Sequence, residues 1–379
     1  MESNENLTEM AGAAADCVAS ADCGEQRPFF SIVMPVYGVE RYLASAIECL
    51  LAQTFGDWEL VVVDDASPDG SAEIARGYEQ SDSRVRLLQL ERNGGASAAR
   101  NAGMQLARGI YIGFLDPDDT YDAGMLQAVR DSIEHDPADI VLFGLEEAYY
   151  DADGEFQYSN EVLPRECVCR TPDEVHAQVL DLEVSLLLGY TWNKFYLRER
   201  LDGLRYEEDV ALIEDAFFNI EFFDRARSAN LLAIAPYKYV KRQGDNLTNK
   251  FVPEYFELHR RRIAMVYDQQ CRWGLDSPEV RQTMGALFGR YILSALERNC
   301  DPRAQMSHAE RATWCRELFG DELFKRLIPG ARARDSRSLD ICLGVLRRRS
   351  TMLCCMMGRA IHIVRGRANK GYNKIKSRR

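Results

Sequence analysis

The stretch FFSIVMPVYGVERYLASAIECLLAQTFGDWELVVVDDA, from Phe29 to Ala66, decides the expected fold. It contains two apolar runs rich in β-branched residues, 29–37 and 58–66, and such runs predict buried strands. Between the two runs, residues 39–53 have the spacing of apolar residues that is typical of a helix. Strand, helix and strand in this order predict a parallel βαβ unit.

The same alternation continues along the chain. Apolar runs at 85–91 and 110–116 predict two more strands, and 138–150 predicts a fifth. One helix is expected after Ser71 and another after Ser97, which we take as its N-cap. The expected fold class is therefore α/β, with a doubly wound, mostly parallel sheet that carries helices on both faces.

The second half of the chain changes character. Residues 171–174 (Thr-Pro-Asp-Glu) form a capping box that predicts a helix running to about Leu188. Another helix is expected at 214–226 and a strand at 231–242, and beyond residue 252 the pattern is helical throughout. A boundary near residue 250 is expected, with a helical module after it.

Four regions follow from these patterns. Residues 1–28 are expected to be a disordered N-terminal segment, and 29–250 to form the α/β domain. Residues 251–340 are expected to form the helical module, and 341–379 a basic amphipathic tail.

Composition indicates a soluble globular protein whose charge is unevenly distributed. The chain has 379 residues, with 47 basic and 59 acidic side chains and a net charge of -12. Residues 341–379 nevertheless contain eleven Lys or Arg and no Asp or Glu.

The eleven cysteines lack metal-site spacing and are expected to be reduced, in a cytosol. The N-terminus does not resemble a secretory signal, and no apolar window reaches the roughly 20 residues of a membrane span. Any membrane contact is expected to be peripheral.

Acidic clusters follow two of the predicted strands. Asp64 and Asp65 end the run 58–66, and Asp116, Asp118 and Asp119 follow the run 110–116. In parallel sheets, ligands bind in the crevice at the carboxyl ends of the strands. Carboxylates that are held close together favour a hard cation such as Mg²⁺ or Mn²⁺.

Each acidic cluster also has a purely structural explanation. Asp-Pro-Asp-Asp, at 116–119, is favourable β-turn chemistry, and by itself that explanation is preferred. An EF-hand is excluded, because Tyr121 and Gln127 stand where the loop requires Gly and Glu. A third acidic pair, Glu214 and Asp215, lies in the first turn of a predicted helix, where by default it complements the helix dipole.

Taken in order, these motifs resemble a known family. Residues 29 to about 250 are similar to the family 2 glycosyltransferases of bacterial surface-polysaccharide synthesis, which have the GT-A fold. The resemblance is carried by SIVMPVYGVERYLASAIECLLAQTF, WELVVVDDASPDGS, NGGASAARNAGMQLARG, YIGFLDPDDTYDAGML, TWNKFYLRERL, the Glu214-Asp215 pair and YKYVKRQGDNLT. One departure is Gly38, where the family usually has Asn.

The resemblance implies a nucleotide-sugar site. Pro35, Tyr37 and Glu40 would line the nucleotide base, and Asp65 would accept a hydrogen bond from the base ring. Arg100 would face the phosphates or the acidic loop; the alternative is an ordinary surface arginine.

The resemblance also assigns the chemistry. Asp118 would bind the divalent metal, Mn²⁺ or Mg²⁺, and Asp116 would lie near the metal and the ribose or donor sugar. Asp215, next to Glu214, matches the general base of a single displacement, so inversion is expected. The nucleotide-sugar donor would be UDP-linked, and the acceptor a glycan or a lipid-linked glycan.

Three further residues are implied on the acceptor or diphosphate side, namely Trp192, Lys194 and Arg242. For Trp192 the alternative is core packing. The basic tail would bind an anionic inner membrane surface, which predicts a cytoplasmic, peripheral protein. Its alternatives are a solvated tail and nonspecific contact with nucleic acid, and no specific nucleic acid is expected as a partner.

Two other functions fit parts of the sequence. Asp116, Asp118 and Thr120 also match the first motif of haloacid-dehalogenase-like phosphatases, in which Asp116 would be the nucleophile. The later motif of that family has no counterpart here, and three βα units precede Asp116. A binding module that kept the fold without the chemistry is the third possibility.

Overall fold

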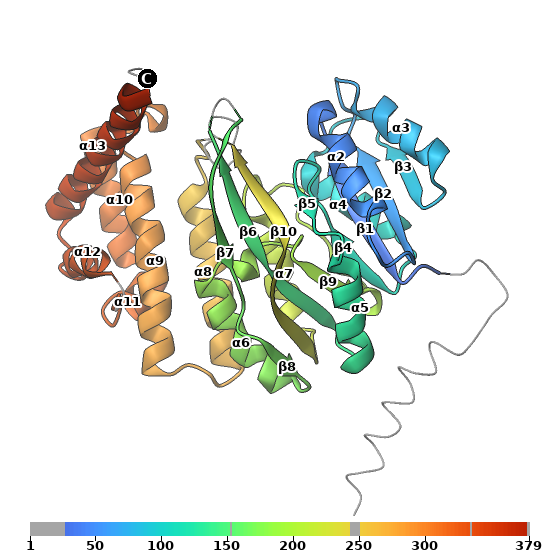
Figure 1. Ribbon diagram of the computed structural model, residues 1–379. Helices are drawn as coiled ribbons and strands as arrows, with labels where there is room; N and C mark the ends of the chain where they lie inside the picture. Colours follow the sequence, from blue (N-terminus) through green and yellow to red (C-terminus); the bar gives the residue numbers. More distant parts are fainter. Residues whose placement is uncertain (1–26, 152–153, 243–250, 334–335, 377–379) are drawn as a thin grey trace, which may run out of the picture. The chain divides into compact units, whose positions relative to one another are not determined.

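The chain forms two compact units, which are considered separately. The computed structural model describes residues 27–151, 154–242, 251–333 and 336–376, with side chains to Arg365 (Figure 1). The first unit comprises residues up to Val175, Gly189–Glu208 and Glu221–Gly244. The second comprises His176–Leu188, Asp209–Ile220 and Asp245–Arg379. The second unit thus includes two segments from before residue 245, and the domain limits expected from the sequence stay a prediction. The expected N-terminal segment, 1–28, lies outside the described residues except for Arg27 and Pro28.

The first unit is built on one mixed sheet, in the order β3-β2-β1-β4-β9-β6-β10-β5. In addition, β7 pairs with β6, and β8 with β10. Adjacent strands run parallel in β3-β2-β1-β4 and in β6-β10. The bounds are β1 Phe30–Val36, β2 Trp58–Asp64, β3 Val85–Gln89, β4 Tyr111–Phe114, β5 Thr120–Tyr121, β6 Ile140–Tyr150, β7 Phe156–Val162, β8 Cys167–Cys169, β9 Lys194–Leu197 and β10 Ala229–Arg242. The α/β class with a mostly parallel, doubly wound sheet is confirmed.

Continuous apolar runs become the central strands because both of their faces are covered. Every residue of β1 and β2 is buried, as parallel strands between helical layers require. The helices of the first unit are α2 Glu40–Leu51, α3 Ser71–Ser81, α4 Gly95–Leu106 and α5 Met125–His135. In α2, Leu43, Ala46, Ile47 and Leu50 are buried at helical spacing.

The start of α4 differs from the prediction. Ser97 was expected to be the N-cap, but the helix begins at Gly95, and Ser97 is buried within the first turn. The first amide groups are instead capped by Asp65, whose carboxylate oxygens accept hydrogen bonds from the N–H groups of Gly94, at 2.8 Å, and Gly95, at 2.7 Å. Because the capping side chain is 30 residues away along the chain, a local capping pattern does not reveal it.

The antiparallel strands were not anticipated. β9 is only four residues long, yet it lies between β4 and β6 and pairs antiparallel with both. None of the residues of β7, FQYSNEV, is buried, and the segment lacks the apolar signal of a strand. β5 and β8 are too short for a sequence pattern to identify.

The second unit is helical, as predicted for the region beyond residue 252. Its helices after that point are α8 Tyr255–Arg272, α9 Pro278–Arg298, α10 His308–Gly320, α11 Glu322–Leu327, α12 Arg337–Arg347 and α13 Thr351–Lys376. Two earlier helices, α6 Pro172–Val184 and α7 Glu214–Phe223, each contribute residues to both units. Inside the second unit, Arg262 donates to the fully buried Glu183 at 2.6 Å. Within the described residues, no helix has both the length and the apolar character that a membrane span requires.

A close helix–sheet contact in the first unit depends on a glycine. A Cβ added at Gly103, in α4, would lie 2.3 Å from Val33 Cγ1 and 3.1 Å from Val63 Cγ2. Both valines are buried in the sheet and are stiff at χ1, so they can move little. The glycine therefore lets α4 lie directly on β1 and β2.

We predict that Gly103→Ala destabilises the protein by about 1–3 kcal/mol, because the added methyl group overpacks this contact. The measurement is the midpoint of thermal unfolding. The matched control is Gly77→Ala in α3, where a Cβ meets no described atom within 4 Å. This control is expected to stabilise by up to about 1 kcal/mol through helix propensity. Effects of the same sign and size at both positions would contradict the close packing of α4.

Candidate active site

Three loops of the first unit meet at one edge of the sheet. β1 lies between β2 and β4 and runs parallel to both, so the carboxyl ends of the three strands share an edge. Among the predicted site residues, Tyr37 and Glu40 follow β1, Asp65 follows β2, and Asp116 and Asp118 follow β4. The sheet thus brings together side chains that are far apart in the sequence.

The loops after β1 and β2 are joined by several hydrogen bonds. Ser67 Oγ accepts from Gly38 N at 3.2 Å, and Ser71 Oγ accepts from Val39 N at 3.1 Å. Asp69 accepts from Glu40 N at 3.1 Å, while Glu40 Oε2 accepts from Gly70 N at 2.8 Å. The predicted base-binding residue Glu40 therefore also holds the two loops together.

Of the other residues predicted to line the base, Pro35 is buried in β1 and Tyr37 is exposed. Pro35 is paired with Val63 of β2. The side chain of Tyr37 lies just beyond the strand and is 51% exposed, so it is open to a ligand. Gly38 follows with a φ of 67°, a left-handed conformation that Gly and Asn adopt more readily than other residues. The departure from the family's Asn therefore preserves the backbone geometry.

Asp64 and Asp65 are both buried, at 2% exposure. Asp64 Oδ1 accepts from Ser67 N at 3.3 Å, and Asp65 caps α4 as described above. Asp65 therefore fixes the glycine turn that precedes α4. The predicted hydrogen bond from Asp65 to a nucleotide base stays a prediction.

The acidic loop after β4 is held from two sides. On one side, Arg100 of α4 donates to Asp116 Oδ1 at 3.1 Å. The guanidinium of Arg100 also lies 5.5 Å from the ring centre of Tyr206. Arg100 is only 5% exposed, so it is a buried partner of the acidic loop and the surface-arginine alternative is wrong.

On the other side, Asp119 connects the loop to β10. Its carboxylate accepts from the Tyr237 hydroxyl and from Val240 N, both at 2.8 Å. Burial, and then the like charges of Asp118 and Asp116, raise the pKa of Asp119 well above its usual range. The site thus concentrates negative charge where a cation would relieve it.

Asp118, between these two held residues, is the more accessible carboxylate, with a side chain that is 47% exposed. Arg242, at the end of β10, places Nη1 3.8 Å from Asp118 Oδ2. The guanidinium of Arg242 also lies 4.2 Å from the ring centre of Tyr42 in α2. Arg242 is therefore next to the acidic loop, as predicted for a residue on the diphosphate side.

Trp192 and Lys194 are buried in the first unit. The Trp192 ring stacks on Tyr237 at 3.9 Å, with an interplanar angle of 16°, and on Tyr190 at 4.4 Å. Lys194, with no exposed surface, donates to Asn193 Oδ1 at 2.8 Å and to the carbonyl of Tyr190. Trp192 is therefore packed in the interior of the first unit, which was the alternative expected for this residue. Their contact with an acceptor stays a prediction.

The third acidic pair belongs to the second unit. Glu214 and Asp215 begin α7 and are partly exposed, directly after Ile213, whose φ is 60°. A positive φ at a β-branched residue is strained, and such strain is typical of functional sites. The role of Asp215 as a base stays a prediction.

The acidic loop is compatible with a bound divalent cation. In the part of the chain that the structure describes, no three His, Cys, Asp or Glu side chains form a complete ligand set. Mg²⁺ and Mn²⁺ in nucleotide sites, however, take one or two carboxylates and complete their shell with phosphate oxygens and water. The accessible Asp118, with Asp116 two residues away, meets that requirement.

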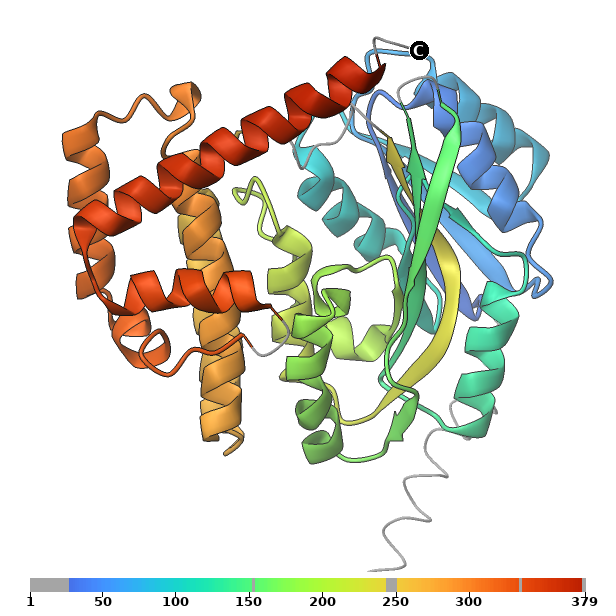
Figure 2. The ribbon, with the colours of Figure 1, turned by 60° about the vertical axis from the view of Figure 1, so that its left-hand side comes forward.

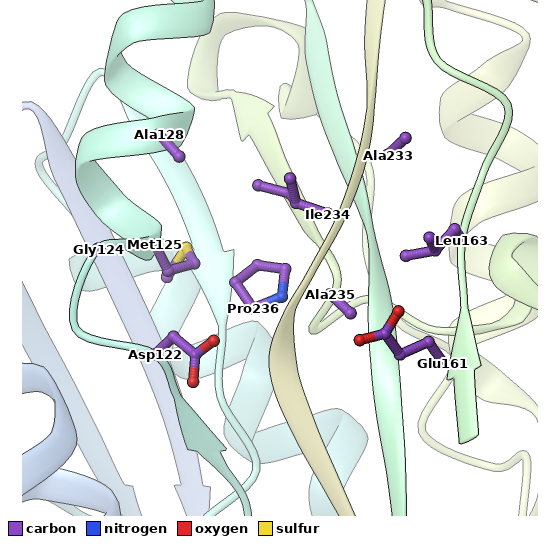
Figure 3. A pocket seen from close by; sticks show the side chains of 10 residues that line it. All are labelled: Asp122, Gly124, Met125, Ala128, Glu161, Leu163, Ala233, Ile234, Ala235 and Pro236. Atoms are coloured by element: carbon purple, nitrogen blue, oxygen red, sulfur yellow. The ribbon is translucent and has the colours of Figure 1, made fainter. Parts of the chain in front are cut away.

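A cavity of about 570 Å³ lies elsewhere on the first unit (Figure 3). It is lined by Asp122, Gly124, Met125, Ala128, Glu161, Leu163, Ala233, Ile234, Ala235 and Pro236. It lies where β10 changes register against β6, between Leu232 and Tyr237. The cavity contains none of the predicted site residues, so its volume does not identify the active site.

Comparisons with known proteins show what part of the chain is similar to. Residues 31–199 match the family model described as "Glycosyl transferase family 2". The uncharacterized glycosyltransferase EpsJ of Bacillus subtilis (strain 168) is 35% identical over 214 residues, which cover 56% of this chain and 61% of EpsJ. The minor teichoic acid biosynthesis protein GgaB of the same strain is 30% identical over 219 residues, 56% of this chain and 23% of GgaB. The chain therefore matches less than two thirds of either relative.

Solved structures support the fold. The crystal structure of S. aureus TarS 1-349 in complex with UDP-GlcNAc superposes with a TM-score of 0.59. It covers 88% of this chain and 91% of the TarS chain, at 19% sequence identity. At that level of identity, the similarity shows the fold alone.

We predict that Tyr237→Phe destabilises the protein by about 1–3 kcal/mol, because a buried Asp119 oxygen loses its hydrogen-bond donor. The measurement is the midpoint of thermal unfolding. Tyr239→Phe is the control, since Tyr239 is two residues away and its hydroxyl has no hydrogen-bond partner among the described residues. A Tyr237→Phe variant as stable as this control would show that Asp119 does not depend on the hydroxyl.

Proposed function

We propose that the protein is a metal-dependent, inverting glycosyltransferase of surface-polysaccharide synthesis, because residues 31–199 match the model of glycosyltransferase family 2. It would move a sugar from a nucleoside diphosphate sugar to a hydroxyl of a glycan or lipid-linked acceptor. The similarity to the glycosyltransferase EpsJ and to the teichoic acid biosynthesis protein GgaB supports this process. The phosphatase and binding-module alternatives lack such support.

One observation carries the proposal. Arg100 holds Asp116 in the loop after β4, and β10 holds Asp119 in the same loop. Between these two residues, the side chain of Asp118 is 47% exposed. A loop fixed at both ends presents an accessible carboxylate without having to reorganise when the donor binds. Preorganised charge of this kind lowers barriers in reactions where charge develops on a leaving group.

The chain's own groups fit a diphosphate donor. Asp118, with Asp116, would hold Mn²⁺ or Mg²⁺, and the metal would neutralise charge on the departing nucleoside diphosphate. Arg242, 3.8 Å from Asp118, supplies a further positive charge on the same side. Tyr37, exposed beyond β1, offers its ring to the base. TarS, which shares the fold, was crystallised with UDP-GlcNAc, so UDP-linked sugars are the first donors to test.

The acceptor half of the reaction needs one base. In a single displacement, one carboxylate removes the proton of the acceptor hydroxyl as the sugar carbon changes partners. Asp215, in the first turn of α7, is proposed for this task, with Glu214 beside it. A retaining route would require a carboxylate nucleophile about 5 Å from an acid, as in retaining hydrolases. Inversion is the simpler chemistry for this set of residues.

Two substitutions separate donor binding from chemistry. We predict that Asp118→Asn abolishes the Mn²⁺-dependent rise in melting temperature that UDP-GlcNAc or UDP produces, because only native-state binding stabilises the protein. Asp215→Asn is expected to keep that rise and to slow transfer by roughly 10²–10⁴-fold, as loss of a general base does. The measurements are thermal shift and release of UDP.

The matched control is Asp122→Asn, the same change four residues from Asp118 but in the lining of the separate cavity. It is expected to leave both readouts unchanged. If Asp118→Asn and Asp122→Asn behave alike, the acidic loop is not the metal site. If no nucleotide sugar of a UDP, GDP and dTDP panel shifts the melting temperature with Mn²⁺, the proposed function fails.

We further propose that the C-terminal helices contact an anionic inner membrane surface, where a lipid-linked acceptor would lie. On α13, Met352, Met356, Arg359 and Ile363 recur at spacings of four, three and four residues, so they share one helix face. Met352 is 67% exposed, Met356 61% and Ile363 43%. An exposed apolar stripe with basic residues is typical of helices that lie in the membrane interface.

The opposite face of α13 packs within the second unit, on α9 and α10 (Figure 2). Cys354 is fully buried, and a Cβ at Gly358 would lie 2.5 Å from the Leu296 carbonyl oxygen. His362 Nδ1 and Glu297 Oε1 are 2.9 Å apart. The exposed stripe is therefore presented on a helix whose orientation is fixed by its buried side.

We predict that full-length protein sediments with vesicles containing anionic lipid, and that the double change Met352→Asp and Met356→Asp lowers the bound fraction several-fold. The reason is that both carboxylates oppose apolar burial and are repelled by the anionic surface. The double change Met352→Leu and Met356→Leu keeps the apolar face and should bind as the wild type does. Equal binding by all three proteins would contradict the membrane assignment.

A further inference from the structure

We propose that an aromatic strip on the first unit binds the acceptor as a chain of pyranose rings, an inference that rests on the proposed glycosyltransferase function. The aromatic strip consists of Trp192, Tyr237, Tyr239, Tyr149 and Tyr158. It leads from the acidic loop across β10, β6 and β7. Such a strip would favour an acceptor whose sugar rings carry equatorial substituents and are therefore flat.

Strand pairing places these side chains on one face of the sheet. Tyr237, Tyr239 and Lys241 alternate along β10, and residues at this spacing share a face. Lys241 is paired with Tyr149 of β6, which is paired in turn with Tyr158 of β7. The strip therefore runs along one strand and then across two others.

The contacts within the strip are continuous. Trp192 stacks on Tyr237 at 3.9 Å, and its ring centre is 5.5 Å from that of Tyr239. The ammonium of Lys241 lies 5.1 Å from the Tyr239 ring and 5.2 Å from the Tyr149 ring. Tyr149 and Tyr158 stack at 4.5 Å, with an interplanar angle of 16°.

The strip connects the acidic loop to solvent. At the inner end, Tyr237 is fully buried and donates its hydroxyl to Asp119. Tyr239 and Tyr149 are half-buried, and Tyr158, at the outer end, is 52% exposed. A ligand that lies on the accessible rings would therefore have one end close to the proposed site of transfer.

The chemistry of the strip suits a sugar chain. Pyranoses with equatorial substituents have flat arrays of C–H groups that pack on aromatic rings, while their hydroxyls need hydrogen-bonding partners at the edges. Such partners are present, because Tyr149 donates to Glu147 at 2.8 Å and Lys241 donates to the Tyr149 hydroxyl at 3.3 Å. The rings can pack against the C–H faces of a sugar, while the charged groups beside them can bind its hydroxyls.

The charge of this surface disfavours a nucleic acid. Aromatic rings also bind stacked bases, but such sites need positive charge along the phosphate backbone. Here Lys241 is paired with Glu147, and Lys238 with Glu146 at 3.8 Å. Both described lysines of this surface are therefore neutralised by a glutamate, and a neutral glycan fits it better than a phosphate backbone does.

The strip is long enough for an oligosaccharide. From Tyr239, the innermost accessible ring, to Lys241 the strand rises about 7 Å, and the two strand spacings to Tyr158 add about 10 Å. A monosaccharide would cover only a part of this length. The inference therefore predicts that affinity increases from a monosaccharide to a tetrasaccharide.

Chitotetraose, a β-1,4-linked chain with equatorial substituents, is the probe, with N-acetylglucosamine as the short analogue. We expect full-length protein to bind chitotetraose in saturation-transfer-difference NMR, at least about tenfold more tightly than N-acetylglucosamine. Tyr158→Ala should weaken chitotetraose binding roughly tenfold, since the outermost stacking surface is lost.

Phe156→Ala is the matched control. Phe156 is on the same strand and is 54% exposed, but its ring packs edge-on against Tyr150, beyond the register shift between β6 and β7, and among the described residues it contacts no ring of the strip. This variant should bind chitotetraose within about twofold of the wild type, because the strip is intact. Equal losses in the two variants would overturn the strip as the binding surface.

A parallel readout keeps the inference separate from the proposed function. UDP with Mn²⁺ should raise the melting temperature of wild type, Tyr158→Ala and Phe156→Ala equally, because Tyr158 lies at the far end from Asp118. If that shift is present and chitotetraose does not bind, the aromatic strip is refuted while donor binding stands. If the shift is absent in all three proteins, the proposed function fails instead.

Discussion

The carboxylate of Asp119 joins the loop after β4 to strand β10, and the rest of the site depends on that connection. The Tyr237 hydroxyl and the Val240 amide hold it, and the Tyr237 ring is fixed in turn by stacking on Trp192. Burying a carboxylate near two others is unfavourable, as the raised pKa of Asp119 shows. On the proposed function, the cost would be offset because a preorganised acidic loop meets a cationic ligand without rearrangement.

The parallel core was predictable because its signals are local and strong. The apolar runs at 29–37 and 58–66 became β1 and β2, and their helical connection became α2. β9 could not be predicted in the same way, since four residues beginning with a lysine do not identify a strand between β4 and β6. Ser97 was predicted to be the N-cap because nothing in the sequence near α4 indicates that Asp65 caps this helix. Long-range capping and strand insertion are tertiary effects that override local propensity.

The candidate site likewise contains residues that local sequence patterns predict and residues that only the tertiary structure reveals. Clustered aspartates after a predicted strand indicated the acidic loop, because strand ends of a parallel sheet converge on one edge. The support for that loop came from Tyr237, which is 118 residues from Asp119 and carries no pattern of its own. Trp192 and Lys194 matched a family motif, and the structure buries both. A motif in the sequence thus did not by itself separate residues open to a ligand from residues packed in the interior.

The hydrogen bonds between the loops after β1 and β2 have an evolutionary consequence. Ser67, Ser71, Asp69 and Glu40 hold the shape of these loops through backbone amides, whereas Tyr37 projects beyond β1 and is half exposed. On the proposed function, in which Tyr37 contacts the base, loop shape and base preference would be encoded by different side chains. Exchange of the residue at position 37 would then change which base is preferred while the loop scaffold persists, which would give a descendant of this chain a short mutational path to a new donor.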